Sequence, residues 1–108
     1  MLGSFKQMLG RTPPEIVWIC SVNATPRVGT ENAQQFADAH VFCCIRTPLR
    51  SGAEQGVAHL LNEHGWEPVG IPSCEVAEPS VIPKPLRELH RTALRDGEAI
   101  RIVAHSTL

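Results

Sequence analysis

The chain of 108 residues contains no tyrosine, and its aromatic residues are two tryptophans and three phenylalanines. No segment approaches the roughly 20 apolar residues of a transmembrane helix, and the N-terminus has no apolar core long enough for a signal peptide. The formal net charge of −1 argues against general affinity for nucleic acids or membranes. No phosphate-binding loop, C-x-x-C pair or H-x-x-x-H pair is present. We therefore expect no cofactor, no metal site and no membrane contact, and nothing indicates an enzyme.

Four cysteines lie in apolar, strand-like runs: Cys20, Cys43, Cys44 and Cys74. Neighbouring residues of a strand point to opposite faces, so Cys43 and Cys44 cannot easily share a partner. Buried thiols without a disulfide pattern indicate a reduced, cytoplasmic protein.

Residues 1–14 are interrupted by Gly3, Gly10, Pro13 and Pro14, and we expect a flexible N-terminal arm there. Residues 15–108 are enough for one domain with a single core.

The central unit of that domain extends from Ala39 to Ile71. Residues 39–46 are β-branched, aromatic and apolar, which predicts a strand. Ser51 and Glu54 have the spacing of a capping box at the start of a helix, and Gly65 can end that helix. The next strand begins at Trp66 and contains two prolines, which favour the edge of a sheet.

The remaining elements flank this unit. Strands are predicted over 15–22 and 98–105, and a second helix runs from Leu86 to Gly97. Between residues 23 and 38, Thr30 could cap a short helix, or the segment is a functional loop. Two helices on one face of a four-stranded mixed or antiparallel sheet form an α+β two-layer sandwich of ferredoxin-like type.

This pattern resembles a group of short bacterial proteins of unknown function. The strand 39–46, the helix end Glu63-His64-Gly65-Trp66 and the helix end within residues 88–98 carry the resemblance. It implies a bacterial cytoplasmic α+β domain and no particular activity.

Strand alternation predicts two apolar sheet faces. We expect Val17, Ile19, Val41, Cys43 and Ile45 to pack under the helices. The opposite face would carry Ile16, Trp18, Cys20, Val22, Phe42 and Cys44, with His40 and Arg46 at its ends. A two-layer fold leaves that second face uncovered, so we expect an interface there, formed by Ile16, Trp18, Cys20, Phe42 and Cys44.

The second helix carries a basic stripe of possible anion contacts, namely Lys84, Arg87, Arg91 and Arg95. Nearby carboxylates offset its charge, and no aromatic residue interleaves with it to stack on bases, so nucleic-acid binding is the least favoured function. The leading hypothesis is a non-enzymatic domain that acts through protein contacts, as a homodimer through the open sheet face or with another protein partner. The alternative is a small-molecule-binding domain or small enzyme with a pocket between the sheet face and the 23–38 segment.

Overall fold

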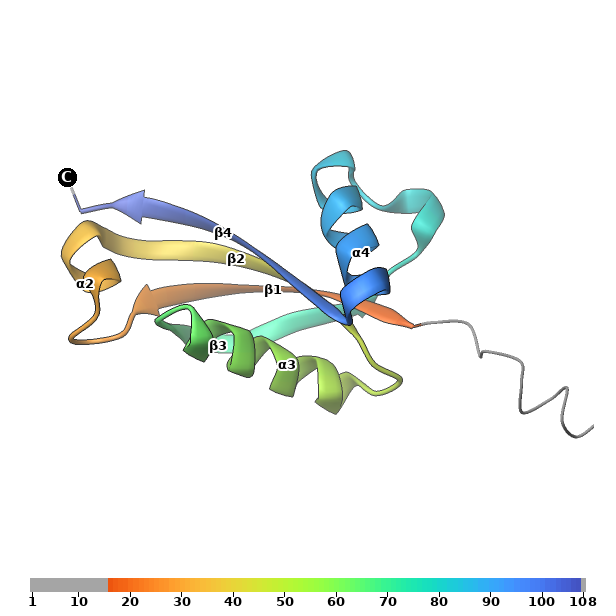
Figure 1. Ribbon diagram of the computed structural model, residues 1–108, viewed down its shortest axis with the longest axis horizontal. Helices are drawn as coiled ribbons and strands as arrows, with labels where there is room; N and C mark the ends of the chain where they lie inside the picture. Colours follow the sequence, from red (N-terminus) through yellow and green to blue (C-terminus); the bar gives the residue numbers. More distant parts are fainter. Residues whose placement is uncertain (1–15, 108) are drawn as a thin grey trace, which may run out of the picture.

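The structure is a computed structural model, and it describes residues 16–107. The predicted arm, residues 1–14, lies outside this range. The elements follow one another along the chain (Figure 1) as β1 (Val17–Pro26), α2 (Glu31–Gln35), β2 (Phe36–Arg46), α3 (Arg50–Glu63), β3 (Trp66–Val76), the 3₁₀ helix η1 (Pro79–Val81), α4 (Lys84–Asp96) and β4 (Glu98–Ser106).

The four strands form one antiparallel sheet in the order β3-β1-β2-β4. The α+β class and the four-stranded sheet are thus confirmed. The strand order does not confirm a ferredoxin-like topology.

β3 lies at one edge of the sheet, as its prolines predicted. Pro68 and Pro72 lack the N–H group that an inner strand would need on both sides. The register with β1 shifts between Ser21 and Asn23, and Gly70 on the facing part of β3 has a φ of 82°. This edge is therefore irregular, which discourages pairing with a further strand.

Helix α3 covers one face of the sheet. Its buried side chains are Ala53, Val57, Leu60 and Leu61, which recur at helical spacing along one side of the helix. They join the main apolar core with alternate residues of the strands, including Cys20, Val22, Val41, Cys43, Ile45 and Cys74. The helix ends at Glu63 with His64 as its C-cap, and Gly65, the next residue, has a φ of 79°, the left-handed conformation expected there.

The predicted capping box at the start of α3 is wrong. The helix begins at Arg50, one residue before Ser51, and the backbone N–H of Ala53 donates to the carbonyl of Leu49 at 3.2 Å. Leu49 is the N-cap residue and no side chain caps the helix. Ser51 and Glu54 consequently lie within the first turns instead of bridging the helix start.

Helix α4 packs on the opposite face of the sheet, so the expectation of both helices on one face is wrong (Figure 1). Ala93 of α4 forms a second buried cluster with Val17, Cys44 and Ala99. The adjacent residues Cys43 and Cys44 point to opposite faces, and each meets a different helix. The sheet and α3 make two layers, and α4 adds a third at one end.

The strand register also corrects the predicted sheet faces. Trp18 is paired with Ile45 and Cys20 with Cys43, whereas Ile19 is paired with Cys44. Because paired residues share a face, the predicted sets exchange their β1 members. A change of one residue in the register moves all side chains of a strand to the other face. The sequence of one strand does not show how it is aligned with its neighbour.

The segment 23–38 contains strand as well as helix. β1 continues to Pro26, α2 occupies Glu31–Gln35, and β2 begins at Phe36, earlier than predicted. Thr30 is at the N-cap position, but its hydroxyl donates to the carbonyl of Arg27 at 2.7 Å.

Within residues 16–107, no helix has the length and apolar character needed to cross a bilayer.

Candidate functional site

The predicted interface residues do not form one surface. Trp18 and Cys20 lie on the α3 face, where the indole N–H of Trp18 donates to the Thr47 carbonyl at 3.0 Å. Phe42 and Cys44 lie on the α4 face, and Cys44 is fully buried beneath α4. Ile16, just before β1, is 37% exposed.

The α4 face has a buried end and an open end. Leu89, Ala93 and Leu94 of α4 cover only the first part of it. The face consists of cross-strand rows: Glu75, Ile19, Cys44 and Ala99; then Ser73, Ser21, Phe42 and Arg101; then Val69, Asn23, His40 and Val103. Beyond α4, this surface mixes aromatic, aliphatic and polar groups. We call this uncovered part, which begins with the row of Ser73, Ser21, Phe42 and Arg101, the open face.

A pocket of about 410 Å³ lies where the open face meets the chain that leads into α4. Ile19, Ser21 and Phe42 form its sheet side, and the opposite wall includes Ile82 and Leu86. Its volume falls within the roughly 300–1,000 Å³ of small-molecule sites. The 76–86 segment encloses it, whereas residues of the 23–38 segment, where a pocket was predicted, contribute to a second pocket described below.

The polar groups of this pocket are acidic or neutral. Glu75 and Glu78 contribute carboxylates, and Ser21 and Ser73 contribute hydroxyls. No lysine or arginine is among the described residues that line it. The pocket therefore combines an apolar wall with negative charge at its rim.

Two histidines lie further along the open face. His40 Nδ1 lies 2.8 Å from Asn23 Oδ1, and its ring meets Phe42 edge-on at 4.7 Å between centroids. His105 Nδ1 lies 2.6 Å from the Asp38 carboxylate. An acceptor oxygen at Nδ1 places the proton on that nitrogen, so a neutral ring presents Nε2 as an acceptor.

A second pocket of about 400 Å³ adjoins these histidines. Asn23, Thr25, Asp38, Val69 and His105 contribute to its lining. The open face thus carries a pocket at each end, and the His40 ring lies between them, against Phe42 of the first pocket.

The cysteines are buried free thiols, and none has the setting of a nucleophile. Burial raises the pKa of Cys43 to about 12 and that of Cys44 to about 11. Burial also raises the pKa of Cys20, and Cys74 opposite it acts in the same direction. A reactive thiol needs a lowered pKa, so these side chains act as packing groups.

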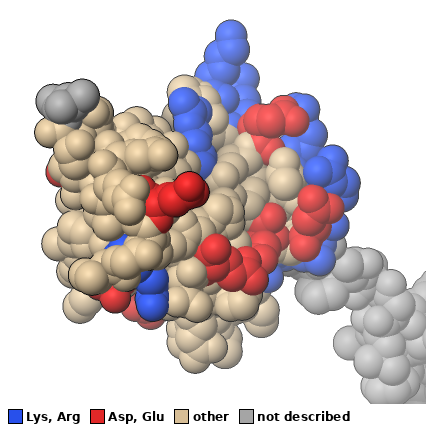
Figure 2. Space-filling model, turned by 60° about the vertical axis from the view of Figure 1, so that its left-hand side comes forward, with Lys and Arg blue, Asp and Glu red and all other residues tan. Residues whose placement is uncertain are grey.

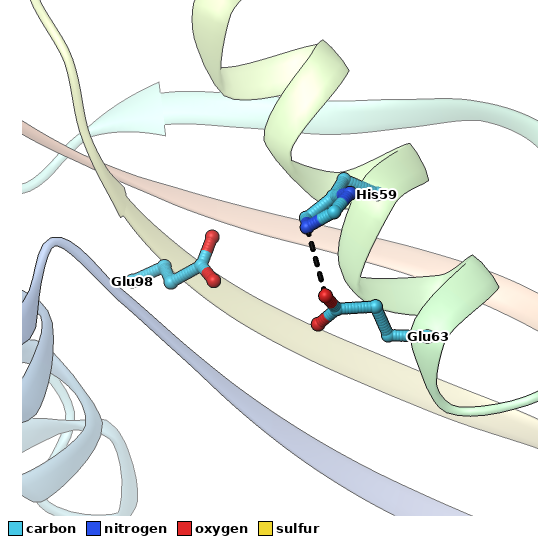
Figure 3. A group of neighbouring side chains, drawn as sticks. All are labelled: His59, Glu63 and Glu98. Carbon is cyan, nitrogen blue, oxygen red and sulfur yellow. Dashed lines mark ion pairs between the residues drawn. The ribbon is translucent and has the colours of Figure 1, made fainter.

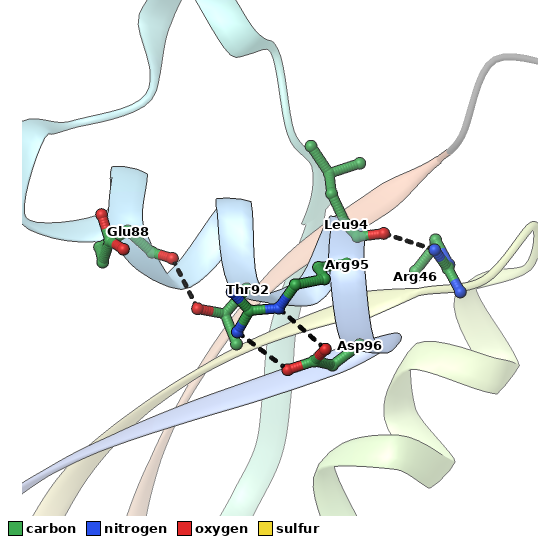
Figure 4. A network of polar contacts seen from close by, with 6 residues as sticks. All are labelled: Arg46, Glu88, Thr92, Leu94, Arg95 and Asp96. Atoms are coloured by element: carbon green, nitrogen blue, oxygen red, sulfur yellow. Dashed lines mark hydrogen bonds and ion pairs between the residues drawn. The ribbon is translucent and has the colours of Figure 1, made fainter.

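The basic stripe lies on the exposed side of α4, and carboxylates pair with two of its four charges. Arg91 contacts Glu88 at 2.9 Å. Arg95 forms two contacts with Asp96 at 3.0 and 3.1 Å (Figure 4). The hydrogen bond with Arg95 lowers the pKa of Asp96. Figure 2 shows one face of the molecule, with blue and red side chains side by side at the right and a mostly uncharged surface at the left. This pattern weakens the case for a polyanion site.

His59 and Glu63 of α3 meet Glu98 at the start of β4 (Figure 3). His59 Nε2 lies 3.0 Å from Glu63 Oε1, and one potential ligand atom from each of the three residues lies within 4.8 Å of the others. Such exposed groups often gather without an ion. The cluster is a surface ion pair beside a second carboxylate.

Sequence reasoning missed the two imidazole–acceptor pairs on the open face. His105 and Asp38 are 67 residues apart, and only the pairing of β2 with β4 brings them together. His40 was expected on this face, and its neighbour Asn23 could have been found from the correct β1–β2 register.

The chain matches no family model, no curated protein and no solved structure. The resemblance to short bacterial proteins therefore stays a prediction.

Proposed function

We propose that this protein is a non-enzymatic binding domain whose open face holds a small apolar molecule bearing a cationic group. The observation that carries the proposal is the 410 Å³ pocket. Ile19, Phe42 and Leu86 would enclose the apolar part of the ligand. Glu75 and Glu78 favour an ammonium or amidinium group at the rim, and the rim would repel an acid.

Binding is favoured over catalysis because the nearby polar groups lack a nucleophile. The serine hydroxyls of the pocket have no imidazole base beside them, since His40 and His105 lie outside its lining and hydrogen-bond with Asn23 and Asp38. The buried thiols are held in the protonated form. We propose the cytoplasm as the compartment, since four reduced thiols suit a reducing environment.

Self-association through the open face, the hypothesis favoured by the sequence, has less support. The register moves Trp18, Cys20 and Val22 to the α3 face, and the apolar area left for a partner is correspondingly smaller. Phe42 and Val103 remain, but they alternate with polar residues across the sheet.

The test is a titration of ¹⁵N-labelled protein with small aryl- and alkylamines and with carboxylic acids of matched size. We expect the amines to shift the amide signals of Ser21, Phe42 and Ser73, and the acids to have little effect. The double variant Glu75→Gln/Glu78→Gln should weaken amine binding several-fold, whereas Glu31→Gln on the exposed surface of α2 should not.

Equal responses to amines and acids would refute the role of the carboxylates. Signals that shift only outside the pocket, or no shift at millimolar amine, would overturn the proposed site itself.

A further inference from the structure

The two edges of the sheet differ in a way that bears on assembly. The β3 edge is broken by Pro68, Pro72 and a register shift. The β4 edge is nine residues long, Glu98–Ser106, and contains neither proline nor glycine. Its pairing with β2 is regular from Asp38 to Ile45. Among the described residues, no strand covers its outer side.

An edge strand of this kind offers a row of backbone N–H and C=O groups to a further strand. Natural edges are usually protected by proline, by a bulge or by a lysine that points inward. β3 has the first two. β4 has neither proline nor lysine, and the register shift in its pairing with β2 lies at its C-terminal end, between Phe36 and Asp38 of β2. The β4 edge is therefore available to pair with a further strand.

We propose that β4 pairs with β4 of a second copy of this chain, antiparallel about a two-fold axis at Ile102. The two sheets would then form one continuous sheet of eight strands. This assembly is independent of the ligand proposed above, and it uses the sheet edge in place of the open face.

The side chains on the α3 side of β4 fit this register. Ile102 would face Ile102 of the second copy, Ile100 would face Ala104, and Glu98 would face Ser106. Ile100, Ile102 and Ala104 are partly buried apolar residues that pack against the main core. Helix α3 packs on β3, β1 and β2. The outer surface of Ile100, Ile102 and Ala104 on β4 therefore stays open for a partner to cover. Cross-strand apolar pairs of this kind stabilise a sheet.

Arg101, on the α4 side of β4, favours the same register. With the axis at Ile102, Arg101 faces Val103 of the second copy. With the axis one residue earlier, two Arg101 guanidinium groups would lie directly opposite each other, which is unfavourable. With the axis one residue later, Glu98 loses its partner within the strand. Only the register centred on Ile102 pairs all nine residues.

A single strand pair is smaller than a standard protein interface, so we expect the dimer to form at micromolar concentration or above. Sedimentation equilibrium of the full chain over a wide concentration range tests this. Ile102→Lys should weaken dimerisation at least tenfold. Ile71→Lys on the β3 edge, where Ile71 is 86% exposed, is the matched control and should leave the dimer unchanged. Phe42→Lys should also leave it unchanged, and loss of the dimer in that variant would point to the open face instead.

Cysteine cross-linking gives a second measurement that does not depend on tolerance of a lysine. Paired residues of antiparallel strands have Cα atoms about 4.5–5.5 Å apart, within the range that a disulfide spans. Ile102→Cys should therefore form a covalent dimer on mild oxidation, and Ala104→Cys, which is out of register with itself, should not. Wild type controls for the native thiols. A protein that is monomeric throughout, or cross-linking by Ala104→Cys but not by Ile102→Cys, would overturn the proposal.

Discussion

Mild alkali should destabilise this protein strongly, because its buried thiols stay protonated while those of the unfolded chain ionise. The pKa is about 12 for Cys43 and about 11 for Cys44 in the folded state, against an ordinary value of 9.0. The folded protein then binds more protons than the unfolded chain above pH 9, so the free energy of unfolding falls as the pH rises. The fall continues until the folded thiols ionise in turn.

The size of the effect follows from these values. Between pH 7 and 10.5, each of the two thiols should remove about 2 kcal/mol from the free energy of unfolding. Together they remove about 4 kcal/mol, a large part of the roughly 5–15 kcal/mol typical of a domain. Cys20, whose pKa is also raised by burial, acts in the same direction. The chain has no tyrosine to titrate in this range, which leaves the thiols as the main contributors.

Urea unfolding followed by tryptophan fluorescence at a series of pH values measures this dependence. Cys43→Ala and Cys44→Ala should each reduce the slope by about 1.1–1.2 kcal/mol per pH unit near pH 10, whatever their stability at pH 7. An unfolding midpoint that does not change between pH 8 and 10.5 would refute the reasoning. So would variants with the same slope as wild type.

Three further substitutions test the packing and the helix ends. Leu61→Ala, at a fully buried position of α3, should cost about 2–5 kcal/mol in urea unfolding, and a loss below 1 kcal/mol would contradict its place in the core. Gly97→Ala, at a φ of 96°, should cost about 1 kcal/mol and lower the thermal midpoint, whereas an unchanged midpoint would show that the helix end relaxes. Trp18→Phe removes the hydrogen bond to Thr47 and should cost about 0.5–1.5 kcal/mol, seen as a lower urea midpoint, and an unchanged midpoint would mean that the bond adds nothing.

Local features of the fold could be predicted from the sequence. The apolar arc of α3 contains the residues that are buried, and Gly65 and Gly97 lie where helices end. The two prolines of β3 predicted an edge strand. These signals succeed because each depends on residues close together in the chain.

The sheet register and the side of the sheet that α4 occupies could not be predicted. Both β1 and β2 are apolar on each face, so alternation alone gives no reason to prefer the pairing of Trp18 with Ile45 over its neighbour. Helix α3 buries the sheet face that carries Cys43. The apolar side chains around Cys44 on the other face remain to be buried, and α4 packs on them. The pocket depends on these long-range choices, and its position was missed for the same reason.

The contacts of Arg46 bear on the order in which the molecule assembles. Its backbone N–H donates to the Gly97 carbonyl at 2.9 Å, and its guanidinium donates to the carbonyl of Leu94 (Figure 4). β4 enters the sheet only beside β2, more than 50 residues earlier in the chain. Closing so long a loop costs entropy, which the contacts made on an already formed β1–β2 hairpin would offset. We therefore expect the C-terminal third of the chain to join the fold last.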